Sequence, residues 1–199
     1  MAGPFDKPPF ANLHCSPLGA RLKPDNTARL IVDLSQPTKN CINEGIDKNE
    51  YRVHYEHFDT AIDIIKKLGP GCLLEKLDIK SAFRLLPVKP AEWHLLGLFW
   101  LGAYFIDCHL PMGCRASPFL FTVLSDLLAW IILKFTSNEN ITHYLDDYLF
   151  ASVGTLEEAV QKLSAALQLL KFLNIPIALK KLVSPTTILV YLGIEIDTV

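Results

Sequence analysis

The sequence predicts an α+β fold in which helices cover one face of an antiparallel sheet. Short apolar runs of strand length alternate with two longer stretches of helical character, 117–135 and 155–175. In the central part of the chain the segments follow the order strand, helix, strand, strand, helix, strand, which describes a β-α-β-β-α-β sheet. Half of the 199 residues are hydrophobic and 20% are charged, so we expect the chain to bury a core.

The first part of the chain predicts an arm, a hairpin and a helix. Residues 1–25 are rich in proline and lack periodicity, so an extended N-terminal arm is expected there. The stretch "LKPDNTAR" has the composition of a tight turn and "ARLIVDLS" that of a strand, which predicts a hairpin with Arg21, Lys23 and Arg29 around its tip. A helix is expected over 57–71, where apolar residues recur at helical spacing before a Gly-Pro pair.

The remaining segments predict the sheet and its helices. The strands are expected within 72–79, 94–113, 141–151 and 186–197. The apolar run from 119 to 135 is interrupted by Ser125 and Asp126 and is short for a membrane span, so a buried core helix is expected. The stretch 155–175 is the clearest amphipathic helix, with Thr155 as its N-cap.

Composition limits the functions that are open to the chain. A net charge of −2 gives no general basic surface, so contact with nucleic acid must come from a local groove or from bound metal. The five cysteines are odd in number and form no CxxC pair, which favours reduced thiols of an intracellular protein over a zinc site or a disulfide framework. The N-terminus has no apolar signal region, so we expect a cytoplasmic or nuclear protein that is not secreted and has no membrane partner.

Three carboxylates are the residues most suggestive of chemistry. Asp146 and Asp147 sit side by side in the apolar stretch "NITHYLDDYLFAS", where burial and mutual repulsion both disfavour them. Asp78, in "KLDIKSAF", is expected at the end of a central strand that would bring it to the same edge. Clustered carboxylates suit hard divalent cations, and two such ions serve in-line phosphoryl displacement. Paired aspartates in a hairpin turn and an aspartate at a strand end are also ordinary turn and capping residues, so both interpretations stay open at this point.

Five segments resemble motifs of reverse transcriptases, in the family's order. "RLKPDNTARLIVDLSQPTKNCIN" resembles the fingers hairpin, "LDIKSAF" and "YLDD" the two metal-binding motifs, "LPMGCRASPFLF" the segment below nucleotide and template, and "YLGIEID" the primer grip. The resemblance runs from about residue 12 to 197. The wording of "NCINEGIDKNEYRVHYEHFDTA" and "THYLDDYLF" further resembles DIRS-type retrotransposons, whose integration relies on a tyrosine recombinase.

The resemblance implies a polymerase palm, a ferredoxin-like β-α-β-β-α-β sheet, over 71–199 and a partial fingers subdomain over 12–70. The chain ends at Val199, directly after the segment like a primer grip, so the thumb is expected to be missing. The implied activity is RNA-directed DNA polymerisation by a two-metal mechanism with two Mg²⁺ ions, for which Mn²⁺ is a possible substitute. The implied partners are an RNA or DNA template, a DNA primer and deoxynucleoside triphosphates. Ribonuclease H activity is expected only from a downstream domain.

The resemblance also assigns roles to individual residues. Asp78, Asp146 and Asp147 become the catalytic metal ligands, with the backbone carbonyl of Ile79 as a further ligand. Phe83 matches the aromatic gate that would clash with a ribose 2′-hydroxyl. The other residues matched to the incoming nucleotide are Lys23, Arg29 and Met112. Those matched to template or primer are Gly113, Arg115, Ser117, Tyr144, Leu192 and Gly193. Lys180 or Lys181 would donate a proton to the departing pyrophosphate.

Two departures and two alternatives accompany this assignment. Met112 stands where many retroviral enzymes carry a glutamine, and the fingers turn is one residue shorter than the retroviral pattern. The first alternative is an inactive or host-adopted fragment that only binds nucleic acid or a partner. The second is a viral RNA-templated RNA polymerase, which shares the palm but usually carries Gly-Asp-Asp, and Phe83 as a gate favours deoxynucleotides.

Overall fold

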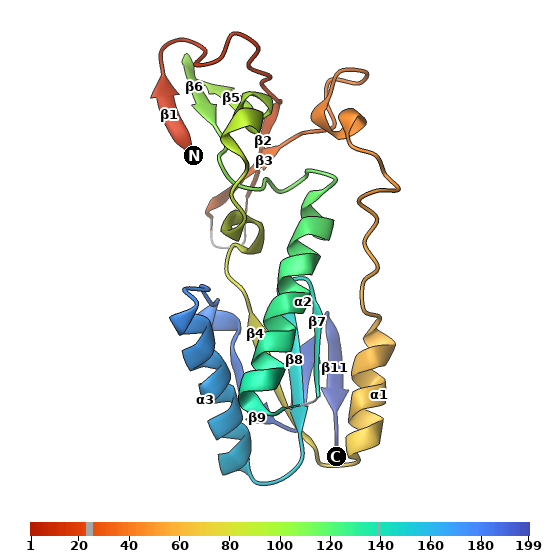
Figure 1. Cartoon of the computed structure of the whole chain (residues 1–199). Helices are drawn as coiled ribbons and strands as arrows, with labels where there is room; N and C mark the ends of the chain where they lie inside the picture. Colours follow the sequence, from red (N-terminus) through yellow and green to blue (C-terminus); the bar gives the residue numbers. More distant parts are fainter. Residues whose placement is uncertain (23–25, 139) are drawn as a thin grey trace. The chain divides into compact units, whose positions relative to one another are not determined.

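The computed structural model describes residues 1–22, 26–138 and 140–199 and divides the chain into two compact units (Figure 1). Unit 1 comprises Met1–Val53 and Phe83–Phe121, and unit 2 comprises His54–Ala82 and Thr122–Val199. The expected boundary between residues 70 and 71 differs from this division. Helix α1 was expected with the hairpin of the first segment, but it belongs to unit 2 because its apolar side packs into the core of that unit.

Unit 2 is built on a four-stranded antiparallel sheet with the strand order β7-β8-β4-β9. Its strands are β4 (Leu73–Asp78), β7 (Ile141–Tyr144), β8 (Asp147–Ser152) and β9 (Val183–Thr186). Its helices are α1 (Phe58–Leu68), α3 (Leu156–Phe172), the short η4 (Leu179–Lys181) and the part of α2 (Ser117–Thr136) that follows Phe121. Along the chain the order is β4, α2, β7, β8, α3, β9, which is the expected element order.

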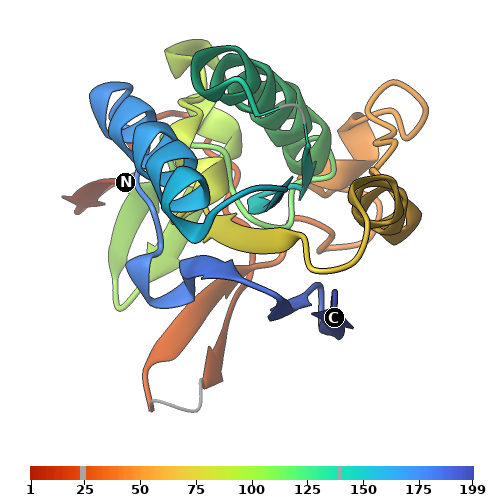
Figure 2. The same ribbon diagram turned by 90° about the horizontal axis from the view of Figure 1, so that it is seen from below.

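Both faces of this sheet are covered: α2 and α3 of the expected β-α-β-β-α-β unit lie on one face, and α1 packs on the other. Leu74 and Leu149 share a core with Ala61 of α1 and with Tyr191 of the hairpin β10 (Ile188–Tyr191) and β11 (Ile194–Asp197). Side chains alternate along a strand, so Tyr148 points to the opposite face, where its hydroxyl meets α2. Figure 2 shows α2 and α3 on one side of this sheet and the β10–β11 hairpin on the other. The apolar side of α1 is buried against the sheet face that α2 and α3 do not cover.

The helix ends of unit 2 follow the local sequence signals. Helix α1 ends at Gly69, whose φ of 88° is a conformation that glycine adopts without strain. Helix α3 begins with a capping box, in which Thr155 and Glu158 satisfy each other's backbone N–H groups. The prediction of Thr155 as N-cap is confirmed.

Helix α2 is buried along one stripe and exposed along another. Ser125, Leu128 and Ile132 are almost fully buried, whereas Val123 and Trp130 are each 57% exposed. The expectation of a buried core helix is therefore half right, since only the stripe that faces the sheet is covered. Among the described residues, α2 is the helix that is long and apolar enough to span a membrane by length and composition, and 22% of that window is buried.

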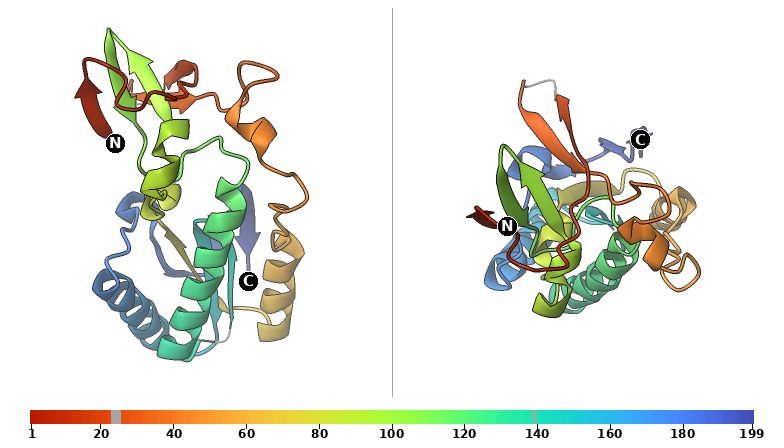
Figure 3. Two further views of the ribbon diagram at one scale, coloured as in Figure 1. Left: turned by 45° about the horizontal axis from the view of Figure 1, so that its top comes forward. Right: turned by 90° about the horizontal axis from the view of Figure 1, so that it is seen from above.

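Unit 1 contains a three-stranded sheet of order β1-β6-β5 and a separate hairpin (Figure 3). The strands are β1 (Ala2–Phe5), β2 (Leu18–Leu22), β3 (Ala28–Val32), β5 (Gly97–Trp100) and β6 (Ala103–Ile106). The short helices are η1 (Ile42–Gly45), η2 (Ala82–Leu85) and η3 (Pro90–Leu95). The predicted arm over 1–25 is wrong in part, because β1 pairs with β6 and β2 pairs with β3. Strand pairing satisfies backbone groups that an extended arm would leave to water.

Candidate active site

Two of the three predicted carboxylates face each other across the central strands of unit 2. Asp78 ends β4, Asp147 begins β8, and the two residues are direct partners in the antiparallel pairing. Directly opposed side chains have Cβ atoms about 4.5–5.5 Å apart, a spacing at which like charges repel. Asp78 is also buried, with an exposed fraction of 3%. The fold therefore holds two acids together against their mutual repulsion.

Asp146 lies in the two-residue turn between β7 and β8. Tyr144 and Asp147 form the last pair of this hairpin, and the turn residue Leu145 has a positive φ of 54°. The carbonyl oxygen of Asp146 accepts a hydrogen bond of 2.9 Å from the backbone N–H of Ile79, the residue directly after β4. This bond fixes the turn, and with it the third carboxylate, at the edge where β4 ends.

The electrostatics of Asp147 fit a cation at this edge. Burial, followed by the neighbouring carboxylates of Asp78 and Asp146, raises the pKa of Asp147 to about 6. Its Oδ1 atom is buried and has no hydrogen-bond partner. A buried acceptor without a partner costs about 1–3 kcal/mol. A hard divalent cation, which prefers carboxylate oxygens, would supply that partner and relieve the repulsion.

The cation-binding arrangement is incomplete in this structure. Within the described part of the chain, no three acidic, cysteine or histidine side chains meet as a ready metal cluster. The expected convergence of three carboxylate side chains is therefore met in part: Asp78 and Asp147 are strand partners, and Asp146 is placed beside them through its backbone. The carbonyl of Ile79 stays a predicted ligand, since the contact that places this residue is made by its N–H.

A lysine lies against the same acids. The Lys181 ammonium forms an ion pair with Asp78, although 57% of the lysine side chain is exposed. The hydrogen bond with Asp78 raises the pKa of Lys181, which keeps the ammonium charged. Helix η4 is placed by the Ala178 N–H, which donates to the Asp78 carbonyl at 2.9 Å. Of the two lysines predicted here, Lys181 is the one with a contact to the acids, and its charge competes with a metal ion for Asp78.

Two tyrosines that the sequence analysis did not single out support this edge. Tyr191 is 2% exposed and its hydroxyl donates to the Asp147 carbonyl at 3.4 Å. Tyr55 packs against Tyr144, with ring centroids 4.7 Å apart. The available signal for Tyr191 was its place directly before the Leu-Gly turn in "YLGIEID".

Comparison with known proteins identifies the family. Residues 22–196 match the family described as reverse transcriptase (RNA-dependent DNA polymerase). The chain belongs to the reverse transcriptase family. No curated protein matches the chain.

Solved reverse transcriptases share the fold. The foamy viral protease–reverse transcriptase in complex with ds DNA has a TM-score of 0.73 and 23% identity over 92% of this chain. The native protease–reverse transcriptase of prototype foamy virus has a TM-score of 0.69 and 24% identity over 92% of the chain. This chain spans 30% and 23% of those two proteins. At this identity the likeness shows the fold alone.

The residues predicted to form the primer grip lie in a tight turn. Leu192 and Gly193 connect β10 to β11, with φ values of 50° and 83°. Tyr191 and Ile194 are the pair that closes the hairpin. Two successive positive φ values are typical of the two-residue turns that match strand twist. The predicted hairpin is confirmed, and contact with a primer stays a prediction.

The residues predicted for the nucleotide lie in unit 1 where they are described. The Phe83 ring packs edge-on against Phe121, with centroids 5.6 Å apart. The Arg29 guanidinium contacts the Met112 sulfur at 2.5 Å, on an exposed surface. Lys23 falls outside the described residues. Arg29 and Met112, which are 83 positions apart, are thus brought together by the fold.

The residues predicted for the template are mostly engaged within unit 1. Gly113 has a φ of 98°, and its carbonyl accepts a hydrogen bond of 2.9 Å from Asn43. The Arg115 guanidinium donates to the carbonyls of Asn43 and Ile46, the latter at 2.7 Å. Ser117 is fully buried and its hydroxyl donates to the Pro111 carbonyl at 2.7 Å, so it holds its own loop and is not exposed to a template strand.

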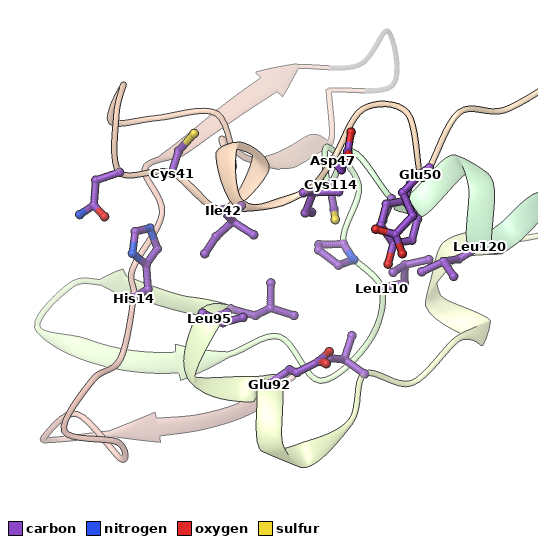
Figure 4. A pocket seen from close by; sticks show the side chains of 18 residues that line it. His14, Cys41, Ile42, Asp47, Glu50, Glu92, Leu95, Leu110, Cys114 and Leu120 are labelled. Carbon is purple, nitrogen blue, oxygen red and sulfur yellow. The ribbon is translucent and has the colours of Figure 1, made fainter.

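Unit 1 also contains a cavity of about 550 Å³ (Figure 4). Leu95, Leu110 and Leu120 supply apolar walls, and Glu50 and Glu92 supply acids. None of the predicted site residues that the structure describes lines it. The cavity is therefore built from residues outside the predicted set.

Proposed function

We propose that this chain is the fingers and palm region of a retroelement reverse transcriptase. It would extend a DNA primer on an RNA or DNA template with deoxynucleoside triphosphates. The observation that carries the proposal is the opposed pair Asp78–Asp147 with its partnerless Oδ1 atom, in a chain of the reverse transcriptase family. Surface placement or capping alone would not require a buried and a half-buried acid to face each other.

The acids would hold the metal ions of the reaction. Two Mg²⁺ ions, or Mn²⁺ in their place, would supply charge neutralisation and activation of the primer 3′-hydroxyl. Asp78, Asp146 and Asp147 would be the ligands, with the Ile79 carbonyl as a further one. The side chain of Lys181 is largely exposed, so its ammonium group can move away from Asp78. It could then donate a proton to the departing pyrophosphate.

Unit 1 would bind the incoming nucleotide. Arg29 lies directly opposite Arg21 on the β2–β3 hairpin, which places two guanidinium groups where a triphosphate would be attracted. Met112, in contact with Arg29, would border the sugar. Phe83 would exclude a ribose 2′-hydroxyl with its ring edge, since Phe121 supports the ring from its side. Lys23 would add a further cation to the same hairpin.

The template and primer strands would contact the remaining predicted residues. Gly113 and Arg115 would shape the template side, and Tyr144, Leu192 and Gly193 the primer side. The foamy viral relatives were solved with ds DNA and with an RNA/DNA hybrid, which supports a template–primer partner. We further propose a DIRS-type retrotransposon as the source and an intracellular location, on the sequence features given above.

Primer extension on poly(rA)/oligo(dT) tests the proposal. We expect Mg²⁺-dependent incorporation of dTTP by the wild-type chain and a loss of about two orders of magnitude or more in Asp146→Asn. Asp63→Asn, an exposed aspartate on α1, is the matched control and should retain activity. Equal incorporation by Asp146→Asn and wild type would dismiss the assignment. Calorimetric titration with Mg²⁺ is the second measurement, and the absence of saturable binding would remove the catalytic case.

A second candidate function rests on the Lys181–Asp78 ion pair. A charged lysine on a metal ligand favours a fragment that binds nucleic acid or a partner without turnover. Such a fragment would bind the template–primer in EDTA as tightly as in Mg²⁺. It would also show no difference between Asp146→Asn and wild type in either assay.

A further inference from the structure

A cluster of polar side chains in unit 2 connects α2 to the turn that carries Asp146. Ser125 Oγ donates to the carbonyl of Leu145 at 2.6 Å and lies 3.1 Å from His143 Nδ1. His143 Nε2 lies 3.0 Å from Asp126 Oδ1, and the Tyr148 hydroxyl lies 2.6 Å from Ser125 Oγ. Ser125 is fully buried, and His143 is 6% exposed. These Ser, His and Asp residues therefore do not form a hydrolase triad, because the buried Ser125 hydroxyl cannot reach a substrate.

Counting the protons of this cluster shows how its bonds depend on one another. Ser125 has one hydroxyl proton, and the Leu145 carbonyl can only accept, so that bond uses the proton. The contact between Ser125 Oγ and His143 Nδ1 then requires a proton on Nδ1. Asp126 Oδ1 lies beside Nε2 and orients the ring. The Ser125–Leu145 and Ser125–His143 bonds therefore form together only when Nδ1 carries a proton.

Two side chains hold the His143 ring in place. Asp126 from α2 contacts Nε2, and Tyr148 from β8 stacks on the ring at 5.1 Å between centroids. Burial raises the pKa of Tyr148, so the phenol keeps its proton and donates to the Ser125 carbonyl at 3.0 Å. A neutral ring with a bare Nδ1 would take the Ser125 proton for itself. The Leu145 carbonyl would then lose its donor.

The turn needs this donor because its backbone is unfavourable. Leu145 has a φ of 54°, a left-handed conformation that L-residues other than glycine seldom adopt. Its carbonyl is bound by Ser125 from α2, and the next carbonyl, that of Asp146, is bound by Ile79 from the end of β4. Two successive peptide groups of the turn are thus held from two different elements.

We propose that Ser125 is a positioning residue, which holds the Leu145–Asp146 turn, and that the His143 ring, oriented by Asp126, keeps the Ser125 proton on that turn by donating from Nδ1. The inference rests on the proposed function, because its effect on chemistry passes through Asp146. Nothing in the "YLDD" motif indicates it. The sequence signal is Ser125-Asp126 interrupting an apolar helix.

Binding of Mn²⁺ alone, followed by electron paramagnetic resonance, tests the inference on the full 199-residue chain. We expect Ser125→Ala to weaken Mn²⁺ binding about tenfold and to lower kcat in primer extension similarly, with the KM for dTTP within about twofold. Ser164→Ala, a serine of α3, is the matched control and should leave both unchanged. Asp126→Asn, whose side chain is 65% exposed, is the second variant and should weaken Mn²⁺ binding about threefold without unfolding the chain.

The outcomes separate this inference from the proposed function. If Ser125→Ala and Asp126→Asn bind Mn²⁺ as tightly as Ser164→Ala does, the positioning role is overturned. The polymerase proposal would still stand in that case. Absence of Mn²⁺ binding by the wild-type chain would overturn both. Nitrogen-15 spectra of the His143 ring provide an independent reading. A protonated Nδ1 supports the cluster as described, and an unprotonated Nδ1 contradicts it.

Discussion

Replacing Glu75 by glutamine should stabilise the fold at alkaline pH. Glu75 lies in the middle of β4, three residues before Asp78, and its exposed fraction is 2%. Its Oε2 atom is buried without a hydrogen-bond partner, and its Oε1 atom has a long bond of 3.4 Å from Ser152. Burial raises the pKa of Glu75 from 4.5 to about 7. The folded chain therefore disfavours the ionised carboxylate.

The magnitude follows from the two pKa values. The difference between 4.5 and about 7 corresponds to about 3 kcal/mol, at about 1.36 kcal/mol per pH unit. A raised folded-state pKa means that the folded chain binds the proton more tightly than the unfolded chain does. The contribution to stability is thus complete below pH 4.5 and is lost as the pH rises through 7. Glu75→Gln carries no such charge, so it should exceed the wild type by about 2–3 kcal/mol at pH 8 and by about 0.5 kcal/mol or less at pH 4.5.

Urea denaturation in EDTA at the two pH values measures the difference. The chain has three tryptophans, and replacing Trp93 and Trp100 by phenylalanine leaves Trp130 as a reporter of unit 2. Glu195→Gln, an exposed glutamate of β11, is the matched control and should show no pH-dependent gain. A Glu75→Gln chain that is no more stable than wild type at pH 8 would refute the reasoning. It would mean that the buried carboxylate finds a partner that the structure lacks.

Two further predictions concern the ion pair at the acids and the loop held by Arg115. Lys181→Met should tighten Mg²⁺ binding about fivefold, because the substitution removes the ammonium group that competes with the ion for Asp78. The factor corresponds to ~1 kcal/mol for an exposed ion pair. Calorimetry with Lys180→Met as control measures this, and an equal effect of both variants would show a general charge effect instead. Arg115→Lys should destabilise unit 1 by about 1–2 kcal/mol, because lysine cannot reach the two carbonyls of Asn43 and Ile46 together. Thermal unfolding checks this against Arg52→Lys, an exposed arginine, and an equal melting temperature for both variants would contradict it.

The elements of the fold were largely predictable because local signals determine them. Periodicity and capping residues placed the helices over 58–68, 117–136 and 156–172 close to their observed bounds. The acidic hairpin and the Leu-Gly hairpin followed from the alternation around short turns. Strand β1 was missed because four residues rich in glycine and proline carry no strand signal until β6 offers a partner.

The side on which each helix packs could not be read from the sequence. An apolar stripe specifies that a helix will be buried but leaves open which sheet face receives it, so the packing of α1 in unit 2 was not foreseen. The same limit applies to α2, which looked uniformly apolar and yet exposes Trp130. Lys181 met Asp78 through the placement of η4 on β4, which involves residues 103 positions apart.

For the candidate site, the sequence by itself determined the three acids, because two carboxylates in an apolar hairpin and a third at a strand end are a chemical anomaly wherever they fold. Only the tertiary structure decided that Asp78 and Asp147 are direct partners, that Lys181 lies on them, and that Ser125 and His143 hold the turn. The physical reason is the sequence distance over which each kind of interaction acts. Local patterns fix backbone conformation over a few residues, whereas register and long-range packing fix which charges meet.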